Sequence, residues 1–287
     1  MFNIFGNIEE WLREGLIEAI TTAFANMFDS INSQVGSVAT NVGQTPQEFN
    51  PAIFEMIRNL SNTVIVPIAG MILTFVMTYE LIQMIIEKNN MHDFDTFIIY
   101  KWVFKTFVAV YILTNTFDIV MAVFEVAQHV INSSAGLISG SLDIDAALTD
   151  LLPQLEAMSI WVLMGLWLEI QIVSLCMRIM SIVVFIIVFG RMIEIYLTVS
   201  IAPIPFSTMV NREWGQMGTN YLRSLFAVAF QGFLIMVCVA IYAVLVQGLT
   251  SASNIHVAIW ITVGYTALLC FTLFKTGTLA KSIFNAR

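Results

Sequence analysis

The stretch Ser159–Met209 constrains the fold more than any other part of the chain. It begins as a long apolar run and ends at a break that holds Pro203 and Pro205. At about 1.5 Å of rise per residue, a helix over 159–189 is longer than the ~30 Å hydrocarbon core of a bilayer. We therefore expect this stretch to cross a membrane. We expect the helix to end at the two prolines, because proline removes a backbone donor and disfavours helix just before it.

Four ionisable residues interrupt the apolar stretch, namely Glu169, Arg178, Arg191 and Glu194. Ionisable groups within a membrane are costly and usually face a partner, a bundle interior or water. At about 100° per residue, Arg178 points away from the other three, which lie within roughly 60° of one another on an unbroken helix. Two interpretations stay open: these charges form ion pairs between helices that fix the packing, or they line a conduit or a seam between subunits.

The composition extends this conclusion to the whole chain. Of its 287 residues 58% are hydrophobic and only 11% are charged, with a mean hydropathy of +0.83, whereas a soluble domain carries about 25% charged residues. A net charge of −8 argues against a basic nucleic-acid-binding surface. We predict an all-α polytopic membrane protein with an N-terminal amphipathic helix and five transmembrane helices, at about 64–86, 97–124, 159–189, 225–246 and 256–274.

The N-terminal region has a different pattern. Residues 7–31 place apolar side chains at steps of three and four against an acidic face, which is typical of an amphipathic helix, and residues 32–50 read as a polar linker. We predict residues 1–55 to form an extracytoplasmic helix and linker, and residues 56–287 to form the transmembrane domain. The helix either lies at the membrane interface or on its own membrane domain, or docks on another subunit.

A long connection, Glu125–Ala157, separates the second and third predicted spans. It contains five carboxylates, no Lys or Arg, and a patch of small residues that includes Ser133, Gly136 and Gly140. Gly136 and Gly140 have GxxxG spacing, but outside a clean apolar run this spacing favours a flexible loop over helix packing. We predict an outer loop here.

The distribution of cations predicts the orientation. Nine of the twelve Lys and Arg residues fall in three regions that five crossings place on one side: Lys88, Lys101 and Lys105; Arg191, Arg212 and Arg223; Lys275, Lys281 and Arg287. The positive-inside rule makes that side cytoplasmic, so the N-terminus lies outside and the C-terminus inside. Lys101 and Lys105 are expected to extend toward the lipid headgroups. A sixth span would require 178–205 to cross separately, and it would place Arg212 and Arg223 outside.

Residue patterns typical of enzymes are missing. The sequence contains no HExxH, P-loop, GxSxG or CxxC motif, and His92, His129 and His256 are scattered. We therefore expect no enzymatic activity, no metal and no cofactor. A secondary transporter with a midplane site around Glu169 and Arg178 is the alternative to a structural subunit, although no inverted repeat is visible.

Several polar runs resemble the short TrbL-like conjugal-transfer membrane proteins of integrative conjugative elements, the polytopic inner-membrane subunits of type IV secretion systems. These runs are Asn41–Gln47, Glu80–Thr96, Thr116–Asp118, Met121–Glu125, Gln128–Val130 and Ala202–Phe206. The similarity extends over nearly the whole chain. The polar runs carry it, because the apolar segments alone would match many membrane proteins.

The resemblance implies a non-enzymatic channel or scaffold subunit in the bacterial cytoplasmic membrane. Such a subunit would form a ring of several copies beside the secretion ATPases, a coupling protein and other secretion subunits. It would support transfer of DNA and relaxase between bacteria, with any contact to the DNA indirect. The family has no agreed catalytic residues, and its usual topology agrees with the five spans and outside N-terminus derived from charge.

Overall fold

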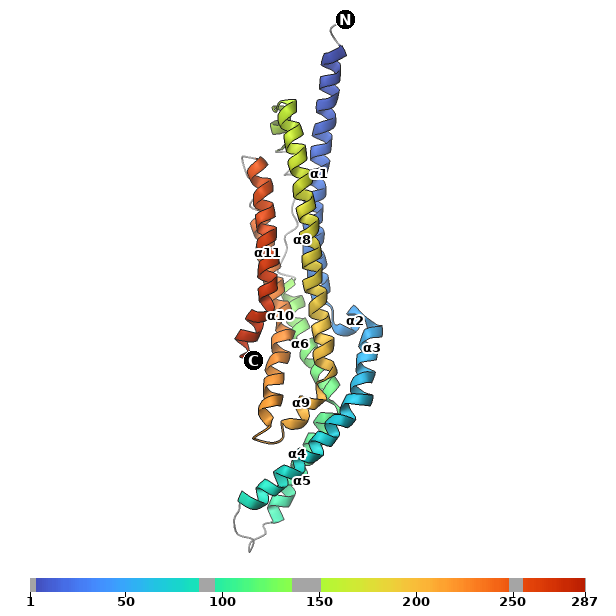
Figure 1. The fold of residues 1–287 in the computed structure, drawn as a ribbon, viewed down its shortest axis with the longest axis vertical. Helices are drawn as coiled ribbons and strands as arrows, with labels where there is room; N and C mark the ends of the chain where they lie inside the picture. Colours follow the sequence, from blue (N-terminus) through green and yellow to red (C-terminus); the bar gives the residue numbers. More distant parts are fainter. Residues whose placement is uncertain (1–3, 88–95, 136–150, 248–254, 287) are drawn as a thin grey trace. The chain divides into compact units, whose positions relative to one another are not determined.

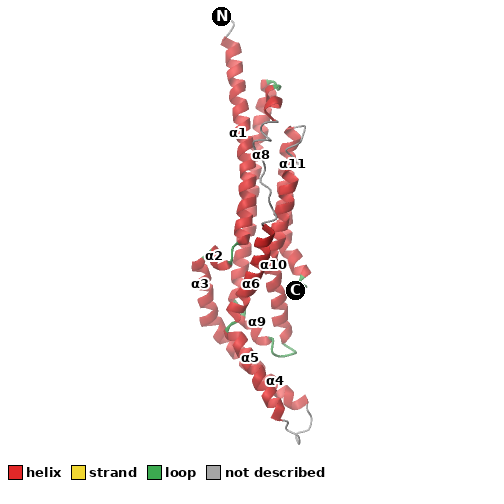
Figure 2. Ribbon diagram, turned by 180° about the vertical axis from the view of Figure 1, so that it is seen from behind, coloured by secondary structure: helices red, strands yellow, loops and turns green. Residues whose placement is uncertain are grey.

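In the computed structural model, all regular structure in the described residues (4–87, 96–135, 151–247 and 255–286) is helical (Figures 1 and 2). Five segments are long and apolar enough to cross a membrane: Pro51–Ile86, Phe97–Thr114, Ile160–Ser200, Gly215–Gln247 and Ile255–Ile283. The predicted all-α polytopic fold is confirmed. The helices are α1 (Ile4–Gly43), α2 (Pro46–Phe49), α3 (Pro51–Leu60), a π-helical turn (Ser61–Ile65), α4 (Val66–Glu87), α5 (Thr96–Thr114), α6 (Thr116–Ala135), α8 (Ile160–Ser200), α9 (Pro203–Thr208), α10 (Gly215–Gln247) and α11 (Ile255–Ile283).

The chain forms two compact units that alternate along the sequence. Unit 1 consists of Met1–Val42, Ser133–Val188 and Leu234–Thr276, and unit 2 consists of Gly43–Asn132, Phe189–Phe233 and Gly277–Arg287. Helices α8, α10 and α11 therefore contribute residues to both units. The predicted division at residue 55 separates an extracytoplasmic helix and linker from a transmembrane domain, and it stays a prediction.

Helix α1 is longer than the sequence analysis predicts. The predicted polar linker 32–50 is wrong over its first part, because α1 continues to Gly43. The buried apolar stripe of α1 continues into this polar segment, because Val38 and Val42 are buried in the same way as Ile20 and Ile31. The residues between Val38 and Val42 are half-buried or exposed, as expected for the other faces of the same helix.

A hydrogen-bonded cap follows α1 and starts the next helices. The Glu48 backbone N–H donates to Thr45 Oγ1, and the Thr45 backbone N–H donates to the Glu48 carboxylate, which together make a capping box. These bonds hold the pKa of Glu48 below its ordinary value. Asn50 caps α3 in the same way by accepting from the Ile53 N–H.

The first membrane-spanning segment joins α3, the π-helical turn Ser61–Ile65 and α4. Pro67 lies in the first turn of α4, where its missing N–H cannot bond to the carbonyl four residues earlier. In a π-helical turn directly before a proline, backbone hydrogen bonds form between residues five apart, so the helix continues past the proline. Helix α4 packs against α5 and α9 in unit 2, and Figure 1 shows α4 and α5 side by side.

The second span is shorter than the predicted 97–124. It ends at Thr114, and the single residue Asn115 separates α5 from α6. The Asn115 Nδ2 donates to the Tyr111 carbonyl at 2.8 Å, and Thr116 Oγ1 donates to the Ile112 carbonyl at 2.8 Å. Side chains that bond to carbonyls of the preceding turn compete with the helical ladder and bend helices. This local polar cluster explains why the long apolar run forms two helices.

The predicted loop Glu125–Ala157 also needs correction. Helix α6 continues to Ala135, so Ser133 belongs to a helix and not to a loop, and residues 151–156 are helical as well. Gly136 and Gly140 lie outside the described residues. In unit 1, the Arg13 guanidinium donates to the Glu156 carbonyl and, at 2.9 Å, to the Met158 carbonyl. A cation on the last carbonyls of a helix satisfies acceptors that the helix leaves open.

The chain leaves α8 at Ser200 and turns through α9, whose first residue is Pro203. Helix α9 is short but almost wholly buried, and Phe206 packs in an apolar core with residues from α3, α6, α8 and α10. Gly218 on α10 comes so close to α9 that an added Cβ would lie 2.6 Å from the Pro205 carbonyl oxygen and against the Met209 side chain. The turn between α9 and α10 therefore requires glycine at this position.

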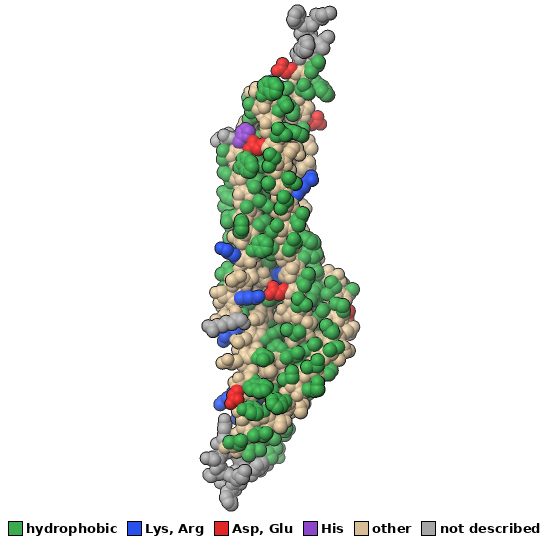
Figure 3. Space-filling view, viewed as in Figure 1, with side chains coloured by type: hydrophobic (Ala, Val, Ile, Leu, Met, Phe, Trp, Pro, Cys, Tyr) green, Lys and Arg blue, Asp and Glu red, His purple; other side chains and the backbone are tan. Residues whose placement is uncertain are grey.

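The surface of the helices is strongly apolar. Large hydrophobic side chains such as Phe104 and Trp161 are 69% and 78% exposed, and Figure 3 shows hydrophobic side chains over much of α3 and α4 on the face seen there. In water such a surface would aggregate, whereas in a bilayer it faces lipid.

We predict that Gly218→Ala destabilises the protein by about 1–3 kcal/mol, because the backbone carbonyl of Pro205 cannot move aside without displacing α9. The thermal midpoint of the purified protein in detergent measures this. Gly264→Ala is the matched control, because Gly264 has open space around its Cβ position. Equal midpoints for the two variants would contradict the close packing.

Candidate functional site

The four charges predicted in the central helix lie in different environments. Glu169 belongs to unit 1, where its carboxylate accepts from His256 Nδ1 and from Trp260 Nε1, each at 2.5 Å. The Glu169 side chain is only 18% exposed. This contact joins the first part of α8 to the start of α11. It is an interhelical contact of the packing type that the sequence left as one of two interpretations.

Arg191 and Glu194 lie in unit 2, one turn apart on α8. Arg191 is 4% exposed and its Nη2 donates to the Ala229 carbonyl of α10 at 3.3 Å, while its Nε has no acceptor among the described residues. Gly232 makes room for it, since an added Cβ would lie 2.6 Å from Nη2. Glu194 instead pairs with Lys281 of α11 at 3.0 Å in a half-exposed position.

Arg178 differs from the other three because its side chain is exposed on an apolar face of α8. Leu175, Ile179 and Ile182 surround it at helical spacing and are 60%, 55% and 59% exposed. In the part of the chain that the structure describes, no carboxylate pairs with it. Within the described residues, Glu169 and Arg178 do not form the midplane site of the transporter alternative, because Glu169 bonds to His256 and Trp260 and Arg178 is exposed.

A second cluster of charges lies in unit 2, and the sequence analysis did not assemble it. Glu80 of α4 is 8% exposed, and its carboxylate accepts from Lys105 of α5 at 2.5 Å and from Asn211 Nδ2 at 2.6 Å. Lys105 was expected to extend toward the headgroups, and that prediction is wrong, because a carboxylate is within reach on the neighbouring helix. One signal was available: five crossings put all three residues on the same side.

The cluster extends to the turn between α9 and α10. Gln83 donates to Glu213 at 2.8 Å, and its own side-chain oxygen accepts from Asn211 at 3.2 Å. Tyr79 donates to Glu213 at 3.1 Å, and its ring packs near Trp214. Three separate stretches of the chain are thus tied together by charge-assisted hydrogen bonds, which are stronger than neutral ones. We name Glu80, Gln83, Lys105, Asn211 and Glu213 the polar cluster of unit 2.

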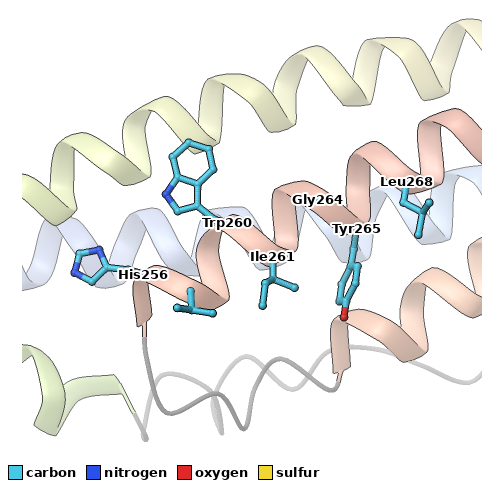
Figure 4. Close-up of a pocket in the computed structure, with 7 residues that line it drawn as sticks. His256, Trp260, Ile261, Gly264, Tyr265 and Leu268 are labelled. Carbon is cyan, nitrogen blue, oxygen red and sulfur yellow. The ribbon is translucent and has the colours of Figure 1, made fainter.

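The N-terminal half of α11 carries an open groove of about 730 Å³. Figure 4 shows its labelled residues, with Trp260 pointing to one side of α11 and with Ile261 and Tyr265 pointing to the other. Apart from His256 the lining is apolar or aromatic, so the groove presents a packing surface and no reacting group. Among residues that the structure describes, no three His, Cys, Asp or Glu side chains are placed to hold a metal ion.

The comparison with protein families decides where this membrane protein belongs. Residues 31–203 match the family described as TrbL/VirB6 plasmid conjugal transfer like protein, which is more than half of the 287-residue chain. The chain belongs to this family. No curated protein and no solved structure matches it.

Membership makes the chain a component of a conjugal-transfer type IV secretion system that works with other components of that system. The family is structural and is not known for an enzymatic activity. The match includes Glu80, Lys105 and the four charges of α8, and it ends at Pro203, so α10 and α11 lie beyond the matched residues.

We predict that Glu80→Leu lowers the stability of the detergent-solubilised protein by about 2 kcal/mol, because it leaves Lys105 and Asn211 partly buried without their acceptor. The double variant Glu80→Leu/Lys105→Met should recover part of the loss, since it removes both charges. A double-mutant cycle on thermal midpoints measures the coupling.

The matched control is the more exposed pair of Arg58 and Asp118, which are 3.4 Å apart with side chains 43% and 67% exposed. Arg58→Ala should cost well under 1 kcal/mol, because exposed ion pairs contribute little. Equal losses of stability at the two pairs would contradict the conclusion that the polar cluster of unit 2 stabilises the fold.

Proposed function

We propose that this protein is a channel or scaffold subunit that forms a ring of several copies in the bacterial cytoplasmic membrane. The ring would support the transfer of DNA and relaxase beside the secretion ATPases, the coupling protein and other secretion subunits. Contact with the DNA would be indirect. The observation that carries the proposal is the family match, joined to five apolar helices that expose many large hydrophobic side chains in the described part of the chain.

We further propose that the N-terminus lies outside and the C-terminus inside. Contacts within each unit support five crossings, because residues that this topology puts on one side touch one another. In unit 2, Glu80 at the end of the first span meets Lys105 and Asn211. With a sixth span, Asn211 would lie on the opposite side from Glu80. In unit 1, Arg13 contacts the connection before α8, and both are assigned to the outside.

Arg178 supports the proposal of several copies. Residues 170–190 of α8 span about 30 Å and carry no charge other than Arg178. Arg178 is nine residues after Glu169, which is about 13 Å along the helix. A Lys or Arg near the end of a membrane helix can extend its charged group to the interface. An Arg as deep as Arg178 needs a hydrogen-bond acceptor or water instead. Among the described residues its apolar surroundings are exposed, so we assign the acceptor to another subunit and place Arg178 at the seam.

We predict that Arg178→Ala reduces the number of chains per detergent-solubilised particle and lowers mating frequency about tenfold or more, because the seam loses a desolvated charge contact. Native mass spectrometry measures the particle, and a mating assay measures transfer against deletion of the gene.

Arg212→Ala is the control, because Arg212 is exposed in the turn between α9 and α10 and outside the spanning segments. Unchanged particle mass together with wild-type mating in Arg178→Ala would remove Arg178 from the seam. Normal mating after deletion of the gene would refute the proposed function itself.

A further inference from the structure

A groove of about 500 Å³ in unit 2 runs between α5 and the turn that follows α9. Helix α5 contributes Lys101, Phe104, Lys105, Val108 and Ile112 along one side. These residues recur at steps of three and four, so they form one continuous ridge along the helix.

The opposite wall of the groove is apolar and comes from the end of α9. Phe206, Met209 and Val210 form it, and Phe206 is anchored in the core of unit 2 while Met209 is 36% exposed. On the α5 side, Phe104 is 69% exposed and Val108 is 37% exposed. The groove is therefore open to the surroundings of the helices, and none of the described residues fills it.

The groove has a charged end and an apolar end. Both lysines lie toward the beginning of α5, and from Lys101 to Ile112 the helix rises by about 16 Å. That length is close to one leaflet, which is half of the ~30 Å hydrocarbon core. Lys101 at the charged end, with apolar side chains over the depth of one leaflet, matches the outline of a phospholipid.

The two lysines do not contribute equally to the charge of the groove. Lys105 is paired with Glu80 at 2.5 Å, and the Lys105 side chain is 30% exposed. Lys101 is exposed one turn away, and within the described part of the chain no carboxylate pairs with it. Among the described residues, the groove therefore keeps one positive charge without a paired carboxylate, next to an apolar surface.

We propose that this groove binds an anionic phospholipid. The headgroup phosphate pairs with Lys101, and one acyl chain lies along Phe104, Val108 and Ile112. Basic pockets between membrane helices on the cytoplasmic side are suited to anionic headgroups. A soluble anion would leave the apolar part of the groove empty, whereas a zwitterionic lipid would bring a second cation close to Lys101. The site goes beyond the proposed function, because it needs only the membrane and no other secretion subunit.

The test uses the full-length protein in nanodiscs made from equal amounts of phosphatidylglycerol and phosphatidylcholine. After gentle release, native mass spectrometry counts the lipids of each kind that stay bound to the protein. We expect retained phosphatidylglycerol to exceed phosphatidylcholine about fivefold, since one lysine near an anionic lipid is worth roughly 1 kcal/mol. Lys101→Gln should bring the two lipids close to equality.

Two further variants separate the groove from general surface charge. Lys275→Gln removes the same charge from an exposed position on α11 and should leave the preference unchanged. Val108→Trp fills the apolar part of the groove, and it should lower retained phosphatidylglycerol even though Lys101 is present.

Equal retention of the two lipids by the wild-type protein would refute the proposal that the groove binds an anionic phospholipid. A protein partner would then be the remaining occupant of the groove. Equal losses in Lys101→Gln and Lys275→Gln would also overturn it, because they would indicate general attraction. Mating assays are not part of this test, so its failure stays distinct from failure of the proposed function.

Discussion

The carboxylate of Glu80 holds together three stretches that are far apart in the sequence. It accepts from Lys105 of α5 and from Asn211 after α9, and Asn211 and Gln83 extend the contacts to Glu213. A buried carboxylate is stable only when such donors surround it. The position of the α9–α10 turn on α4 and α5 follows from this need.

The same requirement separates the charges of α8 into two kinds. Glu169 and Glu194 have partners on α11, and Arg191 is enclosed beside Gly232 with a backbone carbonyl as its acceptor. These three are contacts that fix packing within the chain. Arg178 is the exception, because its side chain is exposed on a surface of exposed apolar residues. Charges that are paired inside a subunit hold its helices together. A charge on an apolar surface needs a partner that the subunit does not supply.

Some boundaries were not predictable from hydropathy because local hydrogen bonds decide them. The apolar run 97–124 gives no sign that Asn115 separates two helices, since the break depends on side chains that bond to carbonyls one turn back. Residues 32–43 look like a linker by composition, yet Val38 and Val42 keep the register of the buried stripe of α1. Composition measures polarity along the chain, whereas helix continuation depends on which face each residue occupies.

By itself, the sequence determined the helical class, the membrane environment and the number of helices long and apolar enough to cross it, because burying backbone polar groups in lipid leaves few choices for long apolar runs. It also placed the end of α8, since proline cannot continue a helix. Only the tertiary structure decided which charges meet. Lys105 finds Glu80 and Glu169 finds His256 because the helices carrying them pack together, and no spacing along one helix contains that information. Pairing between helices depends on their rotation and depth, which arise from the packing of the whole chain.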